Sequence, residues 1–167
     1  DVYKRQVLII GAGWIGLEVA SAARKRGAKA IVIERADRVC ERALAPDMSQ
    51  WLHDLHVRNG VDIRCGVSID YFEGDGKLER AVMTDGIVID CDIAVIGIGL
   101  TPNVELAQVA GLEVNNGIVV DERGQTSHPD IYAAVDNANH PNALLGRRIR
   151  LESWENAQNQ AICAAKA

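Results

Sequence analysis

The sequence predicts an α/β fold in which a parallel sheet is joined to a small antiparallel meander. The apolar run of residues 7–10 is followed by a glycine-rich turn, after which apolar residues recur at helical spacing. Short strand-like segments at 67–73, 78–83 and 86–90 are separated by turn residues, as in a meander. Residues 93–96 are all apolar, which is typical of a strand buried on both faces of a parallel sheet.

The remaining elements follow from periodicity and from turn residues. Apolar positions Met48, Trp51, Leu52 and Leu55 predict an amphipathic helix over 47–59. The other expected segments, in chain order, are a helix ending near Gly27, strands at 30–33 and from Val61, strand and turn at 118–120 and 125–130, a buried strand at 131–135 and a final helix from about Ser153. These elements divide the chain into one domain over 7–110 and a second, partial domain over 111–167.

The glycine-rich turn is Gly11-Ala12-Gly13-Trp14-Ile15-Gly16. It stands between a strand and a helix, where the first glycine permits the tight turn and the second lets backbone approach a pyrophosphate. The third lets the helix pack closely on the strand, and the helix N-terminus offers free N–H groups to an anion. The motif therefore predicts a dinucleotide-binding site. A ligand-free glycine turn in an α/β protein is the alternative.

Glu34 ends the second strand, 23 residues after Gly11. A carboxylate at this place accepts the hydroxyls of an adenosine ribose and repels the 2′-phosphate of NADPH. The guanidinium of the adjacent Arg35 is able to accommodate that phosphate, which leaves NADPH open as the alternative. We expect NADH to be the preferred coenzyme.

Composition excludes several classes of protein. The 167 residues carry a net charge of −5, which disfavours general nucleic-acid binding. No apolar run approaches the ~20 residues that span a bilayer, so we expect a cytoplasmic protein without membrane segments. Cys40, Cys65, Cys91 and Cys163 lack metal-ligand spacing, as do the four histidines, so we expect no metal site and interpret the cysteines as small buried residues.

The two ends of the sequence suggest a piece of a longer protein. Residues 1–6 back-translate to a transposon end used in preparing sequencing libraries, so we expect them to lie outside the fold. A chance hexapeptide is the alternative. Residues 161–167 stop within a helical pattern that has no C-terminal cap.

Five segments in order resemble one family: G-A-G-W-I-G-L-E, E-R-A-D-R-V, D-I-A-V-I-G-I-G-L-T-P-N, H-P-D-I-Y-A-A-V-D and R-I-R-L-E-S-W-E-N-A-Q-N-Q. The chain resembles the flavin-dependent pyridine nucleotide–disulfide oxidoreductases, and among them the NADH:ferredoxin or rubredoxin reductases. The resemblance covers residues 7–167. It implies a Rossmann-like nicotinamide-binding domain followed by the C-terminal portion of an FAD-binding Rossmann-like domain.

The resemblance also implies roles for individual residues. Trp14 would cover the flavin and Glu18 would accept a hydrogen bond from the nicotinamide carboxamide, the two positions closest to catalysis. Both have a plain structural alternative, Trp14 as core and Glu18 as an exposed helix residue. The implied cofactor-binding residues are Gly11, Gly13, Ile15, Gly16, Glu34, Arg35, Arg42, Gly97, Ile98, Gly99, Asp136, Trp154 and Glu155, of which the last three would contact FAD.

Val135 departs from the family pattern, because a glycine precedes the aspartate there. A β-branched side chain would crowd the flavin chain, which puts FAD binding by Asp136 in question. Arg147, Arg148 and Arg150 form a basic cluster suited to an acidic ferredoxin. An ordinary solvated loop is the equal alternative.

We therefore expect a fragment of an enzyme that passes electrons from NADH through FAD to a 2Fe-2S ferredoxin or a rubredoxin. Enzymes of the same fold that reduce oxygen, nitrite or a disulfide are the nearest alternative. A non-catalytic NADH-binding module is the alternative of another class.

Overall fold

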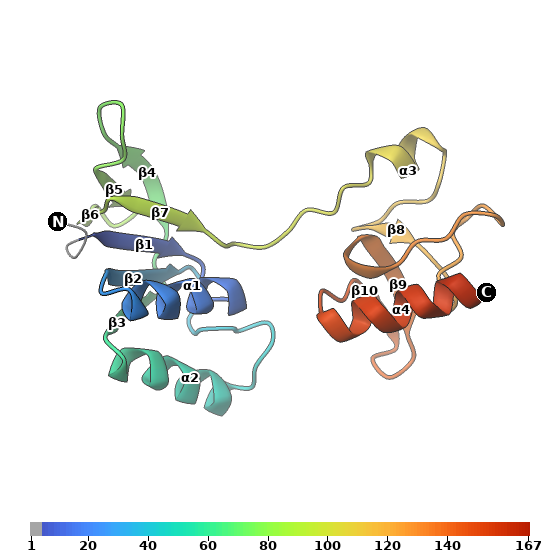
Figure 1. Cartoon of the computed structure of the whole chain (residues 1–167), viewed down its shortest axis with the longest axis horizontal. Coiled ribbons are helices and arrows are strands. Elements are labelled where there is room, and N and C mark those ends of the chain that lie inside the picture. The colour runs from blue at the N-terminus through green and yellow to red at the C-terminus, as the bar shows by residue number, and fades with distance from the viewer. Residues whose placement is uncertain (1–4) are drawn as a thin grey trace. The chain divides into compact units, whose positions relative to one another are not determined.

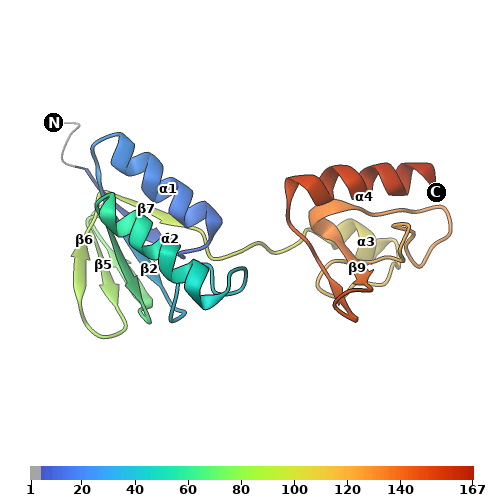
Figure 2. The ribbon, with the colours of Figure 1, turned by 90° about the horizontal axis from the view of Figure 1, so that it is seen from below.

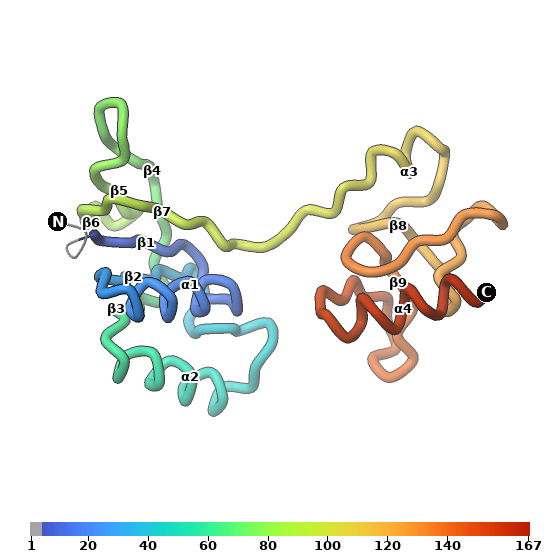
Figure 3. The backbone as a smooth tube through the Cα atoms, in the orientation of Figure 1, coloured from blue at the N-terminus to red at the C-terminus, as the bar shows by residue number. Residues whose placement is uncertain are grey.

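The computed structural model describes residues 5–167, and its backbone forms two compact units, one ending at Gly99 and the other beginning at Leu100 (Figure 3). The division lies before the domain boundary expected at residue 110. Residues 97–104 form neither helix nor strand, and α3 (Glu105–Val109) belongs to the second unit. The first unit thus ends where its sheet ends.

A four-stranded parallel sheet forms the centre of the first unit. It contains β1 (Gln6–Ile10), β2 (Lys29–Glu34), β3 (Val61–Cys65) and β7 (Ile93–Ile96) in the order β3-β2-β1-β7. Every neighbouring pair is parallel. The predicted parallel sheet is confirmed. Of the residues expected to lie outside the fold, 1–4 fall outside the described residues, whereas Gln6 already belongs to β1.

Each face of this sheet is covered by different elements. Helices α1 (Trp14–Lys25) and α2 (Pro46–Arg58) lie on one side, and the antiparallel meander of β4 (Ile69–Glu73), β5 (Arg80–Met83) and β6 (Val88–Asp90) lies on the other (Figures 1 and 2). Alternate residues of β1 therefore enter different cores: Val7 and Ile9 join the helix side, Leu8 and Ile10 the meander side. The predicted meander is confirmed.

Helix α2 has the predicted place and length but packs less closely than α1. Leu52 packs against the core, whereas Met48 and Trp51 are each more than half exposed. Ser49 is the buried residue of this helix. The apolar periodicity thus located the helix correctly but overstated the width of its buried face.

The expectation that residues 93–96 are buried on both faces is wrong. Ile93 is 38% and Ile96 is 60% exposed. The reason is topological, because β7 is the last strand of the order β3-β2-β1-β7 and pairs only with β1 among the described residues. An apolar run predicts a strand of a parallel sheet but does not say whether the strand is central or at the edge.

The second unit contains a smaller sheet. Strands β8 (Ile118–Val119), β9 (Ala138–Asn142) and β10 (Arg147–Ile149) have the order β10-β9-β8, with β8 parallel and β10 antiparallel to β9. The final helix α4 (Trp154–Lys166) begins as predicted, because the Ser153 hydroxyl accepts a hydrogen bond from the Asn156 amide.

The buried strand predicted at 131–135 does not form. Tyr132 makes an isolated bridge with Gln125, and a 3₁₀ turn, η2 (Val135–Asn137), follows. The Thr126 amide donates to the Ile131 carbonyl and the Ala133 amide to that of Gly124. The segment therefore pairs across a local turn and does not extend into a sheet. The β9–β10 hairpin and α3 were not predicted.

Candidate functional site

The carboxyl edge of the parallel sheet gathers the predicted residues of the first unit. Parallel strands end at one edge, and ligands of open α/β sheets bind there (Figure 1). Residues that follow β1 are Gly11, Gly13, Trp14, Ile15 and Gly16. Glu34 and Arg35 lie at the end of β2, and Gly97, Ile98 and Gly99 follow β7. The structure thus brings three separate stretches of sequence to one edge.

Two glycines of the turn are required by close backbone contacts. A Cβ on Gly11 would lie 2.4 Å from the Gly97 carbonyl oxygen, and the φ angle of Gly11 is +104°. A Cβ on Gly16 would lie 1.9 Å from the Gly11 carbonyl oxygen. The backbone segments around Gly11 and Gly16 therefore lie too close together for a side chain, so both glycines are needed by the fold itself.

Gly13 differs from both, because a Cβ there would meet nothing within 4 Å. Its φ of −77° and ψ of −175° are open to any residue. The protein therefore does not itself require glycine here, which fits a place where a ligand approaches the backbone. Gly13 is the N-cap of α1, no side chain caps it, and no acidic residue stands in the first turn. This helix end is suited to an anion.

The Glu34 carboxylate is fixed by two backbone amides. Its Oε2 accepts from the Ala12 amide at 2.7 Å, and its Oε1 accepts from the Ala36 amide at 2.8 Å. Each carboxylate oxygen retains capacity for a further donor. Glu34 thus links the glycine turn to the end of β2 and remains able to accept ribose hydroxyls.

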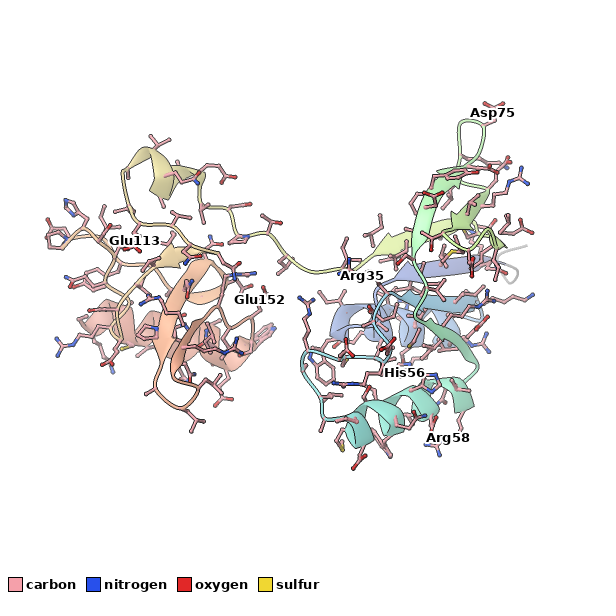
Figure 4. All side chains as sticks on the ribbon, turned by 180° about the vertical axis from the view of Figure 1, so that it is seen from behind. Arg35, His56, Arg58, Asp75, Glu113 and Glu152 are labelled. Atoms are coloured by element: carbon pink, nitrogen blue, oxygen red, sulfur yellow. The ribbon has the colours of Figure 1, made fainter. Side chains whose placement is uncertain are left out.

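Two arginines lie near this edge. Arg35 is exposed at the end of β2 (Figure 4). Arg42 comes from the loop before α2, and its Nη2 lies 3.8 Å from the point where a Cβ on Gly99 would stand. The structure therefore brings the Arg42 guanidinium close to the segment after β7.

The first turns of α1 present exposed side chains. Trp14 is 54% and Ile15 is 59% exposed, and Ile98 after β7 is 68% exposed. Glu18, one helical turn beyond Trp14, is also exposed. These large apolar side chains are exposed beside the glycine-rich turn. They are suited to contact a planar ring system.

The predicted flavin residues lie in the second unit. Asp136 is in η2, and Trp154 and Glu155 open α4. The Val135 amide donates to Gln160 Oε1 at 2.6 Å, which packs η2 against α4. Trp154 is 90% exposed. The structure therefore places all three residues on one turn and the helix beside it.

Val135 adopts a left-handed backbone with φ +75°. A β-branched residue is a genuine outlier there, and glycine would adopt this conformation without strain. The turn that contains Asp136 therefore forms, but with a strained backbone at Val135. The family pattern has glycine where Val135 stands, and the positive φ at this position gives the physical reason for that glycine.

Two of the three arginines in the basic cluster are bonded within the second unit. The Arg148 guanidinium donates to the carbonyl groups of Val120 and Asn139. Arg150 donates to the Asp136 carbonyl at 3.0 Å and pairs with Glu152. Both side chains serve the fold of this unit. Arg147, the third member of the cluster, is exposed, and the expectation that these arginines steer an acidic partner stays a prediction.

The cysteines divide into two groups. Cys40 and Cys91 are buried, and burial is the largest cause that raises the pKa of each thiol. Cys65 is partly buried and Cys163 is exposed, so the interpretation of all four cysteines as buried residues is wrong for these two. Among residues 5–167 no group of His, Cys, Asp or Glu is arranged to hold a metal ion. Over the same residues no helix is long and apolar enough to cross a membrane.

Comparisons with known proteins agree with this arrangement. The chain is 44% identical over 164 residues to the ferredoxin–NAD(+) reductase component of the anthranilate 1,2-dioxygenase system of Burkholderia cepacia, covering 96% of this chain and 40% of that protein. The ferredoxin reductase for the CYP199A2 system of Rhodopseudomonas palustris superposes with a TM-score of 0.93 at 40% identity, over 96% of this chain and 40% of that one.

A covalent complex of putidaredoxin reductase with putidaredoxin gives the same TM-score of 0.93 at 42% identity, over 96% of this chain and 39% of that chain. The chain thus spans about two fifths of the length of the relatives it matches. A family model described as pyridine nucleotide-disulphide oxidoreductase matches residues 2–161. The chain therefore belongs to the pyridine nucleotide-disulphide oxidoreductase family.

Proposed function

We propose that the first unit binds NADH at the carboxyl edge of its parallel sheet. The observation that carries this proposal is the open space at Gly13, beside a glycine turn whose other two glycines are required by the fold. The pyrophosphate would lie against the Gly13 backbone and the N-terminus of α1. Glu34 would accept the adenosine ribose hydroxyls and thereby favour NADH over NADPH.

The second unit, residues 100–167, would supply part of an FAD site. The left-handed backbone at Val135 is one that glycine adopts freely, which fits a close approach of the flavin chain, and the Val135 side chain is the feature against it. Asp136 would hold the ribityl chain, while Trp154 and Glu155 would border the flavin and the nicotinamide. On α1 of the first unit, Trp14 would cover a flavin and Glu18 would accept a hydrogen bond from the nicotinamide carboxamide. FAD supplies the step from two-electron to one-electron transfer when bound.

The whole protein would then pass electrons from NADH to a ferredoxin-type partner, either a 2Fe-2S ferredoxin or a rubredoxin. Relatives that are named ferredoxin reductases support a ferredoxin-type acceptor. We place such a protein in the cytoplasm.

The test is a fluorescence titration that measures the affinity of the 167-residue chain for NADH and for NADPH. Gly13→Ala should weaken NADH binding about tenfold or more while leaving the melting temperature unchanged, because the new methyl group meets only the ligand. Gly76→Ala, in the β4–β5 turn, is the matched control. Its φ of +69° makes alanine costly to the fold, but it is remote in sequence from the site and should leave NADH binding unchanged.

Equal NADH affinity of Gly13→Ala and the unmodified chain would contradict the proposed site. Tighter binding of NADPH than of NADH would contradict the role of Glu34 in coenzyme choice.

A further inference from the structure

The backbone of Ala12, inside the glycine turn, is hydrogen-bonded at both its amide and its carbonyl. Its amide donates to Glu34 Oε2 at 2.7 Å. Its carbonyl accepts from the Cys40 amide at 2.9 Å and from the Cys40 thiol at 3.5 Å. Ala12 is fully buried. The orientation of the chain as it enters Gly13 is thus set by residues outside the motif.

Cys40 is in turn held by α2. The Ser49 hydroxyl donates to the carbonyl of Val39 at 2.5 Å. Ser49 is 1% exposed and Val39 is 0% exposed, so no water competes for this bond. Cys40 itself has a φ of +48°, which directs both its amide and its thiol toward Ala12. Burial and the nearby Glu34 carboxylate raise the pKa of the Cys40 thiol, which keeps it protonated as a donor.

We propose that Ser49 and Cys40 are positioning residues for the phosphate-binding turn. Together they connect α2 to the Ala12 peptide and fix the turn in the conformation that receives a pyrophosphate. A turn held in this way loses less conformational freedom when the ligand binds. This inference rests on the proposed NADH site, and it predicts that a loss of either side chain weakens pyrophosphate-containing ligands selectively.

The experiment compares two probes on the full 167-residue chain: ADP-ribose by calorimetry and adenosine by NMR titration. Ser49→Ala should weaken ADP-ribose binding about tenfold, because the buried Val39 carbonyl loses its donor and the Cys40 segment is released. Cys40→Ala should weaken it about threefold, and Cys40→Ser, which keeps a donor, should restore it. The affinity for adenosine should change less than twofold in each variant.

Cys91→Ala is the matched control, because Cys91 is equally buried but lies in the core on the meander side of the sheet. It should lower stability without changing either affinity. If Ser49→Ala does not fold, as judged by circular dichroism, the comparison of Cys40→Ala with Cys40→Ser tests the inference.

A parallel loss of both ligands, no loss of either, or the same selective loss in Cys91→Ala would overturn the inference. A failure of the unmodified chain to bind ADP-ribose would overturn the proposed function, and this inference with it. Intact ADP-ribose binding combined with unaltered variants would overturn the inference alone.

Discussion

The unit that ends at Gly99 has an apolar cluster on each face of one sheet, whereas the unit that begins at Leu100 buries few side chains. In the second unit the buried apolar residues are Ala107, Val120 and Ala138. The three buried side-chain atoms without a partner among the described residues, Asn139 Oδ1, His140 Nδ1 and Arg150 Nε, also belong to it. Burying unpaired polar atoms opposes folding, and burying apolar area favours it. The comparison indicates that the first unit is held largely by apolar burial and the second largely by hydrogen bonds.

The largest expected difference is in amide hydrogen exchange. The amide of Ile9 in β1 should exchange about a thousandfold more slowly than that of Ile149 in β10, because opening β1 requires both apolar clusters to separate. Exchange measured by NMR on the intact chain checks this. Similar exchange rates of the two amides would contradict the proposed difference in stability between the two units.

A smaller effect is expected from relieving the strained valine of the second unit. Val135→Gly should stabilise this unit by about 1 kcal/mol, since the relief of left-handed strain exceeds the added freedom of the unfolded glycine. Urea unfolding followed at the Ala138 amide signal measures the change. Asn116, with a φ of +46°, is the control: asparagine tolerates this conformation, so Asn116→Gly should change stability by no more than a few tenths of a kcal/mol. A destabilised Val135→Gly variant would contradict the account of strain.

The smallest expected effect is a pH dependence of the stability of the first unit. His56 on α2 is half-buried beside Arg24 and Lys25 of α1, and burial lowers its pKa below the ordinary value of 6.5. The unfolded chain then binds a proton more readily than the folded one, so stability is complete above pH 6.5 and declines as pH falls through that value toward the lower folded pKa. Urea midpoints measured between pH 8 and pH 5 test this.

His56→Gln should flatten this pH dependence in the first unit. His128→Gln, in the other unit, should leave the first unit's profile as it is. An unchanged profile in His56→Gln would show that other groups cause the decline.

The sequence predicted the first unit far better than the second. Strands at 7–10 and 30–33 and the helices after them carry regular periodicities, and these local patterns coincide with the packing that forms. Residues 131–135 carry an equally apolar pattern but form no strand, because their backbone groups pair across a local turn. The hairpin of β9 and β10 had a usable signal in its turn, where the Asn142 side chain accepts from the Leu145 amide and Gly146 has a φ of +60°.

The candidate site shows the same division. The motif alone assigned Gly13 to the approach of a pyrophosphate, and Gly11 and Gly16 to the turn and to helix packing. The structure adds the contacts: a Cβ on Gly11 or Gly16 would clash with backbone, whereas one on Gly13 would meet nothing within 4 Å. Arg148 and Arg150 formed a basic cluster in the sequence, yet their guanidinium groups donate to backbone carbonyls. A charge is visible in a sequence, but its partner is decided by contacts between residues far apart in the chain.

The sequence by itself determined the α/β class, the strand–turn–helix of the dinucleotide motif and the carboxylate at Glu34, because each depends on neighbouring residues or on fixed spacing. The tertiary structure decided that Ser49 bonds to the Val39 carbonyl and Cys40 to the Ala12 carbonyl, that β7 is an edge strand and that Val135 is left-handed. Hydrogen bonds and burial between distant segments carry no periodicity in the sequence, so these features become visible only once the chain is folded.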